Sequence, residues 1–430
     1  MTEVAAETRS GVLTRAEAKE RYEALPMPAT SDEHWRFTNL RGFDPASFGH
    51  GQGQSLDVAR EAMLDLDVSG RAVVTEHGIE ILSAPAGVTF EPLPADYDSK
   101  LIPDDDKFAM QNLAEWEHGL LVHVPKGVEL EKPLYVQVTS TGGTLHWRMV
   151  VIADEGARFS LIEDISSASP GLEAYSNTVV ELFVGENAKI EYVSLQNLST
   201  ETWHFARHKA WLERDSELDW VIGGFGSKRG KVWIENDLVG EGATSRVTGA
   251  YFADGAQHLD YDTFQEHIAP NTESDFAFKG ALRENASAVW RGMIRVEEDA
   301  QKTNRLPGEP QSAALRHGAC RLDSGSRNHG ERRALHPRRH ARPCQPPGAL
   351  LPDDPRLLAG RGRAHDRARL LPGRARPHRT GAGARSTWRR ARSPHPAGLG
   401  RGLSRIPRPG DPPVASKCDD ERNPTSGGSS

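Results

Sequence analysis

Hydrophobic and polar residues alternate with a period of two over much of the chain after residue 120. The alternation is clear in residues 121–124, 135–138 and 189–195. This pattern is typical of β-strands that bury one face and leave the other in contact with water. The central part of the chain is therefore predicted to be mainly β.

The pattern before residue 120 predicts helices instead. Residues 13–25 are predicted to form a short helix. Thr14 and Glu17 have the spacing of a capping box at its start, and Pro26 ends it. A second helix is predicted over residues 105–117, with Phe108, Leu113 and Trp116 as its apolar positions. The Gly- and Asp-containing stretch between them, residues 41–75, has only weak periodicity.

A short turn followed by a strand recurs four times in the alternating region. Each turn ends on a small residue, at Ala157, Ala188, Ser216 and Ala243, so the intervals are 31, 28 and 27 residues. Strands that repeat at such an interval with no helix between them suggest a β-solenoid, with the small residues at corners where coils stack closely. An antiparallel β-sandwich remains the alternative from this pattern alone.

Composition divides the chain sharply after Asn304. Residues 1–304 carry 27 Lys and Arg against 50 Asp and Glu, whereas residues 305–430 carry 26 against 10. The second part has 25 Arg and 17 Pro, and it lacks Phe, Tyr and Met. Such a composition cannot bury enough apolar surface to offset the entropy of ordering, so residues 305–430 are expected to be disordered.

Cysteine usage and the first residues bear on the compartment. All three cysteines, Cys320, Cys344 and Cys418, lie after Asn304, so no disulfide framework is expected in residues 1–304. The first seven residues are acidic and lack the apolar run of a signal peptide. No stretch approaches the roughly 18 apolar residues of a membrane-spanning helix. We expect a soluble cytoplasmic protein.

Two stretches have features of a functional site but lack residues that such a site requires. The Gly-rich stretch 224–232 lacks the first glycine of a P-loop and has Val232 where Ser or Thr must meet magnesium, so it is read as a turn. His204 and His208 have helical metal-ligand spacing but lie in a strand region without a third ligand, which favours packing or surface histidines. The tryptophans are expected in the solenoid core or at an interface; they are Trp203, Trp211, Trp220, Trp233 and Trp290.

Several segments, taken in order, resemble the SufB/SufD family of iron–sulfur cluster assembly proteins, and the SufD branch in particular. The segment from Glu33 to Leu40 resembles an N-terminal family motif, and residues 119–128 resemble the entry into the core domain. Later segments resemble further coils and a Gln-Lys-Thr-Asn run of the family. The matching positions are Trp35, Arg36, Phe37, Thr38, Lys279, Gly280, Gly292, Gln301, Lys302 and Thr303.

The resemblance implies a fold and a role. It implies a right-handed parallel β-helix (119–304) behind an N-terminal helical or mixed region (1–118). It also implies a non-enzymatic scaffold of a SufBCD complex, which pairs with SufB through the β-helix and with the SufC ATPase through a C-terminal domain. No catalytic, cofactor-binding or metal-ligating residue is then expected in this chain, and an iron–sulfur cluster would be held only transiently, by the complex.

The break after Asn304 is interpreted as a loss of reading frame. Back-translating residues 305–311 and skipping one base gives Ala-Tyr-Gln-Glu-Asn-Arg, which resembles the family's continuation. The same skip applied to residues 317–340 and 348–373 gives segments that resemble the SufD C-terminal region. Cys320 and Cys344 are then products of the wrong frame, and the SufC-binding region is expected to be lost.

Two other functional classes remain open at this point. A β-helix enzyme acting on carbohydrate would share the fold, although such enzymes are usually secreted. A nucleic-acid-binding protein would account for the basic residues after Asn304, and it requires that binding disappear when residues 305–430 are deleted.

Re-sequencing the gene across codons 300–310 tests the frame interpretation. We predict one surplus base near codon 305, because a single skip restores three separate family-like segments. Clean reads that encode the same residues as this chain would show that no surplus base was introduced in reading the sequence.

Overall fold

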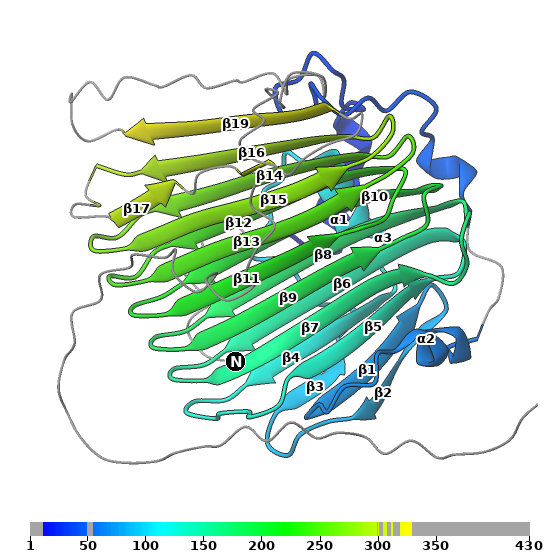
Figure 1. Cartoon of the computed structure of the whole chain (residues 1–430). Coiled ribbons are helices and arrows are strands. Elements are labelled where there is room, and N and C mark those ends of the chain that lie inside the picture. Colours follow the sequence, from blue (N-terminus) through cyan, green and yellow to red (C-terminus); the bar gives the residue numbers. More distant parts are fainter. Residues whose placement is uncertain are drawn as a thin grey trace, which may run out of the picture. The chain divides into compact units, whose positions relative to one another are not determined.

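The computed structural model describes residues 12–49, 55–298 and 300, together with the backbone of three later strands at 304–307, 311–312 and 319–328. All of them lie in one compact unit, Met1–Asp354. Two large sheets dominate it, with strands stacked one above another (Figure 1).

From β4 to β17, successive strands alternate between the two sheets. The first sheet contains, in spatial order, β17 (Asn304–Pro307), β15 (Glu273–Leu282), β13 (Thr244–Ala253), β11 (Glu217–Gly224), β9 (Lys189–Asn197), β7 (Arg158–Ser167), β5 (Leu134–Ser140), β1 (Gly70–Thr75) and β2 (Gly78–Ser83), with β18 (Gln311–Ser312) also beside β15. The second sheet contains β19 (Ala319–Asn328), β16 (Ser287–Val296), β14 (His258–His267), β12 (Arg229–Leu238), β10 (Thr202–Leu212), β8 (Ala174–Val184), β6 (Gly143–Ala153), β4 (His118–Val124) and β3 (Thr89–Pro92).

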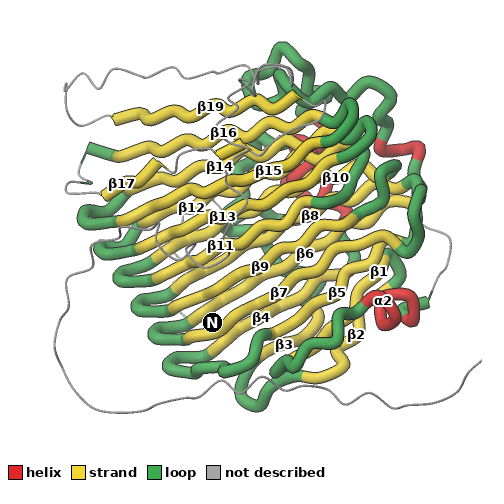
Figure 2. Tube along the Cα trace, in the orientation of Figure 1, coloured by secondary structure: helices red, strands yellow, loops and turns green. Residues whose placement is uncertain are grey.

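All these neighbours pair in parallel except β1 with β2 and β3 with β4. A chain that crosses between two sheets at every turn and pairs in parallel with the coil before it is a β-solenoid. Figure 2 shows the loops gathered at the ends of the strands. The predicted parallel β-helix is confirmed, and the antiparallel sandwich is excluded.

The corners follow the repeat seen in the sequence. Ala157, Ala188, Ser216 and Ala243 are fully buried, each directly before a strand of the first sheet. The residue before each has a positive φ, at Gly156, Asn187, Asp215 and Gly242. Glycine, asparagine and aspartate are the residues that adopt this conformation most readily. Backbone N–H groups at one corner donate hydrogen bonds to carbonyls at the corner of the next coil. Gly156 N–H, for example, donates to the carbonyl of Glu186.

Inward-facing side chains of both sheets form one continuous core, which includes Trp220 and Trp290. Two family-motif glycines make room inside it. A Cβ on Gly280 would lie 1.9 Å from the ring of Tyr251, and one on Gly292 would lie 2.8 Å from the ring of Trp290. Close packing against these aromatic rings therefore explains why glycine stands at both positions.

The predicted helices are present. Helix α1 (Arg15–Ala24) begins with the capping box of Thr14 and Glu17. Helix α3 (Lys107–Glu115) is capped by Asp106, and Phe108, Leu113 and Trp116 are buried as expected. The weakly periodic stretch forms η2 (Pro45–Ser47), α2 (Asp57–Ala62) and the strand β1.

Two boundaries differ from the sequence interpretation. Strand β1 already pairs in parallel with β5, so the sheets begin before residue 119. Strands also continue past Asn304, because β17 and β18 pair with β15, and β19 pairs with β16. Open strand edges offer unpaired N–H and C=O groups, which accept a further strand largely irrespective of its side chains. The remainder of 305–430 lies outside the described residues, and its disorder stays a prediction.

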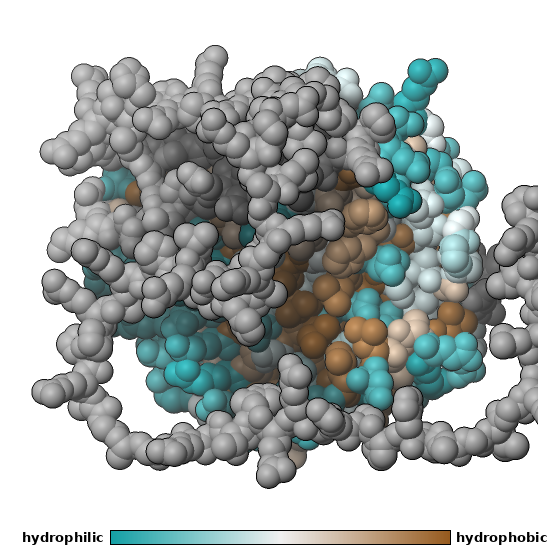
Figure 3. Space-filling model, viewed as in Figure 1, coloured by the Kyte–Doolittle hydropathy of each residue, from teal (hydrophilic) through white to brown (hydrophobic). Residues whose placement is uncertain are grey.

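The two sheets are covered differently. Along β7, β9 and β13 burial alternates residue by residue, whereas β8 is buried at every position and β10 at all but one. Helix α3 contacts β6, β8 and β10 and so covers the outer face of the second sheet. The outer face of the first sheet stays partly exposed, and hydrophobic residues gather over the middle of the face seen in Figure 3.

His204 and His208 are packing histidines, as expected, but inside the solenoid. His208 stacks on Trp220, with ring centroids 5.6 Å apart, and His204 contacts Ser176. Burial lowers the pKa of His204 to about 4 and that of His208 to about 3. Neither ring nitrogen of His208 has a hydrogen-bond partner among the described residues.

Acid should therefore destabilise the fold through His208. A histidine that is neutral when folded, but titrates near pH 6.5 when unfolded, contributes stability above that pH and loses it as the pH falls toward the folded pKa. We predict that from pH 7 to pH 5 the wild type loses about 2 kcal/mol more of its free energy of unfolding than His208→Gln does. Urea unfolding at both pH values measures this.

The exposed His77 provides the control. His77→Gln should keep the wild-type dependence on pH. Equal pH dependence in the wild type and His208→Gln would contradict the burial of a neutral His208.

Candidate functional site

Charged side chains lie buried on the covered outer face of the second sheet. Arg148 on β6 and Glu181 on β8 form an ion pair of 3.0 Å whose side chains are 2% and 0% exposed. Glu181 also accepts hydrogen bonds from the backbone N–H groups of Lys100 and Leu101, both at 2.8 Å. The N-terminal region thus supplies donors that a buried carboxylate on the sheet needs.

A second group of charges lies under helix α3. Arg207 on β10 pairs with Asp106 at 3.4 Å and with Glu235 on β12 at 2.8 Å. Asp106 is also the cap of α3, because its Oδ1 accepts from the N–H groups of Phe108 and Ala109. One carboxylate therefore starts the helix and fixes it to the sheet.

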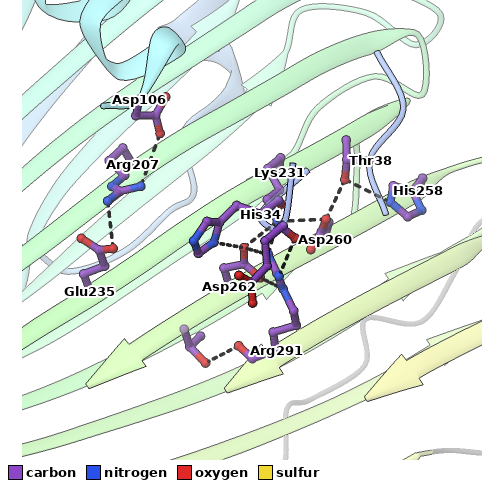
Figure 4. Close-up of polar contacts among 12 residues, drawn as sticks. His34, Thr38, Asp106, Arg207, Lys231, Glu235, His258, Asp260, Asp262 and Arg291 are labelled. Atoms are coloured by element: carbon purple, nitrogen blue, oxygen red, sulfur yellow. Dashed lines mark hydrogen bonds and ion pairs between the residues drawn. The ribbon is translucent and has the colours of Figure 1, made fainter. Parts of the chain in front are cut away.

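The third and largest group lies beneath the segment 33–40, which we call the strap (Figure 4). Lys231 on β12 is fully buried and pairs with Asp260 at 2.9 Å and with Asp262 at 2.7 Å, both on β14. Thr38 of the strap donates its hydroxyl to Asp260 at 2.7 Å, and it lies 3.3 Å from His258 Nε2.

Arg291 on β16 ties the strap to the same group. Its guanidinium pairs with Asp262 and donates to the backbone carbonyls of Glu33 at 2.9 Å and His34 at 3.1 Å. Strap and strands are thus joined through main-chain atoms as well as side chains.

Trp35 fixes the strap from the apolar side. Its ring packs edge-on against Phe108, Phe205 and Trp233, at centroid distances of 5.2, 5.4 and 5.2 Å. Trp203 and Trp233 belong to this outer cluster and Trp211 to a second one, so all three are buried outside the solenoid interior. The prediction of core tryptophans is confirmed for Trp220 and Trp290.

The pKa values of the two aspartates move in opposite directions. Burial raises the pKa of Asp260, although Lys231 and Thr38 partly oppose the change. Burial also acts to raise the pKa of Asp262, but His34, Lys231 and Arg291 together outweigh it, and the pKa lies well below its ordinary range. Asp262 is therefore the fixed negative centre of the group.

The positions that matched the family motifs fall into three sets. Trp35 and Thr38 hold the strap on the sheet, whereas Arg36 is exposed and Phe37 half-buried beside it. Gly280 and Gly292 line the solenoid interior, and Lys279 is exposed on the first sheet. Gln301, Lys302 and Thr303 lie outside the described residues.

The charged residues beneath the strap were not predicted from the sequence. Lys231, Asp260 and Asp262 stand at positions that face away from the solenoid core, where a charge is ordinarily solvated. The available signal was Trp233, because a large aromatic residue at an outward position indicates that the face is covered.

The Gly-rich stretch 224–232 contains the turn between β11 and β12, as expected, and its last four residues, 229–232, belong to β12. Its Lys231 is committed to two aspartates and cannot bind phosphate. Among the described residues, no group of three or more His, Cys, Asp or Glu side chains is arranged to hold a metal ion. The helices described are all too short or too polar to span a bilayer.

Comparison with known proteins gives a consistent result. Residues 136–306 match the family described as "SUF system FeS cluster assembly, SufBD core domain". Among curated proteins, an "Iron-sulfur cluster assembly SufBD family protein" of Staphylococcus epidermidis is 29% identical over 214 residues, which cover 49% of this chain and 46% of that protein.

A protein of the same description from Staphylococcus aureus is 29% identical over 208 residues, which cover 48% of this chain and 45% of that protein. The matched region thus spans about half the length of these relatives. The resemblance to the SufB/SufD family is confirmed, and the matched residues 136–306 lie within the solenoid.

Thr38→Val tests whether the strap is held through Asp260. The change keeps the shape of the side chain but removes the hydroxyl donor from a buried carboxylate, so we predict a loss of about 1–3 kcal/mol in the free energy of unfolding. Trypsin should also cut faster after Arg36 and Arg41, because the strap opens more often.

Thr248→Val is the matched control, since Thr248 is exposed on β13 and its replacement should change stability by less than about 0.5 kcal/mol. Equal effects of the two substitutions on stability and cleavage would refute the role assigned to Thr38.

Proposed function

Since residues 136–306 match the SufBD core domain, we propose that this chain is a SufD-like scaffold subunit for iron–sulfur cluster assembly. It performs no catalysis of its own; ATP hydrolysis belongs to a SufC partner. The chain holds no cofactor permanently, and the nascent cluster is the cargo of the assembled SufBCD complex in the cytoplasm.

The observation that carries the proposal is that the family match falls within the solenoid. The matched residues run from β5 into β17 and include every coil whose outer face the strap covers. The relatives described above are named for iron–sulfur cluster assembly, which favours this role over a carbohydrate-acting β-helix enzyme or a nucleic-acid-binding protein.

Pairing with SufB through the β-helix draws support from the first sheet. Ile162, Val193 and Val221 lie side by side in register on its outer face, and each is only partly buried. A row of partly exposed aliphatic side chains on one face of a sheet is suited to burial against a second protein.

This chain should lack one of the two partnerships. In the family, the region after the β-helix forms the helical domain that binds SufC. Pro- and Arg-rich sequence replaces that region in this protein, for example at Leu371-Pro372-Gly373-Arg374. Proline removes backbone donors and breaks helices, so we expect no docking helix from this sequence.

Co-purification of SufC tests the proposal. The chain in its present frame should not retain SufC and should not complement a SufD deletion, whereas removal of one base near codon 305 should restore both. Pull-down of SufB by both versions serves as the control, because the solenoid strands up to β16 are common to them.

Equal recovery of SufC with the two versions would place its binding site within residues 1–304 and contradict the frame interpretation. Failure of the restored version to recover either partner would contradict the scaffold role itself.

A further inference from the structure

A pocket with a volume of about 360 Å³ opens between the strap and the outer face of β12, β14 and β16. Its lining includes Arg36, Phe37, Trp233, Phe264, Met293 and Arg295. Pockets of this size commonly hold small molecules, with mostly apolar walls and a few polar groups that set orientation.

Both walls of the pocket are fixed without a ligand. On the sheet side, Phe264 and Met293 are neighbours in register on β14 and β16. On the strap side, Arg291 binds the carbonyls of Glu33 and His34, and Thr38 binds Asp260. A pocket with walls held in this way costs little reorganisation when it binds.

Two family motifs that are far apart in sequence meet at this pocket. Arg36 and Phe37 come from the strap, and Gly292, Met293 and Arg295 come from a late coil. The other strap residues of the motif, Trp35 and Thr38, are accounted for by packing and by Asp260. Attachment of the strap involves Phe37 only through Arg291, whose guanidinium lies 6.0 Å from the centre of its ring, and it does not explain Arg36. Both residues line the pocket.

The charges around the pocket are paired, with two exceptions among the described residues, the carboxylate of Glu33 and the guanidinium of Arg36. Arg291 is paired with Asp262 and Arg295 with Glu266 and Glu297, while Lys209 and Arg207 pair with Glu235. The guanidinium of Arg36 has no carboxylate partner in the described part of the chain. It lies 4.8 Å from the centre of the Phe37 ring.

We propose that this pocket binds a small molecule that joins a planar apolar ring to an anionic group, a carboxylate or a phosphate. The ring packs on Phe37, Phe264 and Met293, and the anion pairs with Arg36, whose guanidinium matches the oxygen geometry of both groups. The site is separate from the proposed scaffold role and does not depend on it.

Four probes that carry the same phenyl ring separate the contribution of charge to binding from that of ring packing. They are phenylacetate, phenyl phosphate, neutral phenylacetamide and cationic phenethylamine. Their dissociation constants are measured by ligand-observed NMR titration on the full chain, in enough salt to screen the arginines beyond residue 304. The two anions should bind at least about tenfold more tightly than phenethylamine. The stronger of the two anions identifies the preferred group.

Arg36→Gln should weaken both anions about tenfold and leave phenylacetamide unchanged, whereas Arg36→Lys should keep the preference for anions. Arg246→Gln is the control, because Arg246 is an exposed arginine on the first sheet. Anion binding that is unaffected by Arg36→Gln, weakened equally by Arg246→Gln, or no tighter than that of phenethylamine would overturn the proposal.

Discussion

The arrangement of the N-terminal region depends on one constraint, that every charge on the covered face of the second sheet must find a partner once water is excluded. Arg148, Arg207 and Lys231 each pair with carboxylates on neighbouring strands. Pairs of this kind rarely add stability over an apolar core, because desolvation offsets their attraction, but an unpaired member is costly. Their physical effect is therefore to select one docking position for α3 and for the strap.

The solenoid follows from local rules that the sequence displays. Each corner needs a residue that tolerates positive φ, followed by a small residue that fits beneath the next coil, and Asn187 with Ala188 meets both needs. Alternation predicts strands such as β9, where one face meets water. It fails for β10, whose two faces are both buried, because a covered face removes the polar half of the pattern.

The candidate site could be predicted only in part for the same reason. The strap motif drew attention to Trp35 and Thr38, but the partners of these residues, Trp233 and Asp260, lie some 200 residues later and depend on the stacking of coils. A sequence read without its fold cannot show which distant strand a segment will cover. The match of residues 136–306 to the SufBD core domain supports the proposed role, and the geometry explains the placement of Trp35, Thr38, Gly280 and Gly292.

A double-mutant cycle between Lys231→Met and Asp260→Leu tests the constraint most directly, with free energies of unfolding taken from urea denaturation. Lys231→Met alone leaves a buried carboxylate without its cation and should cost about 3–5 kcal/mol. Adding Asp260→Leu should recover a large part of that loss, so that the two effects are strongly non-additive. Losses that add to within about 0.5 kcal/mol would show that the two residues act independently, and would contradict the account.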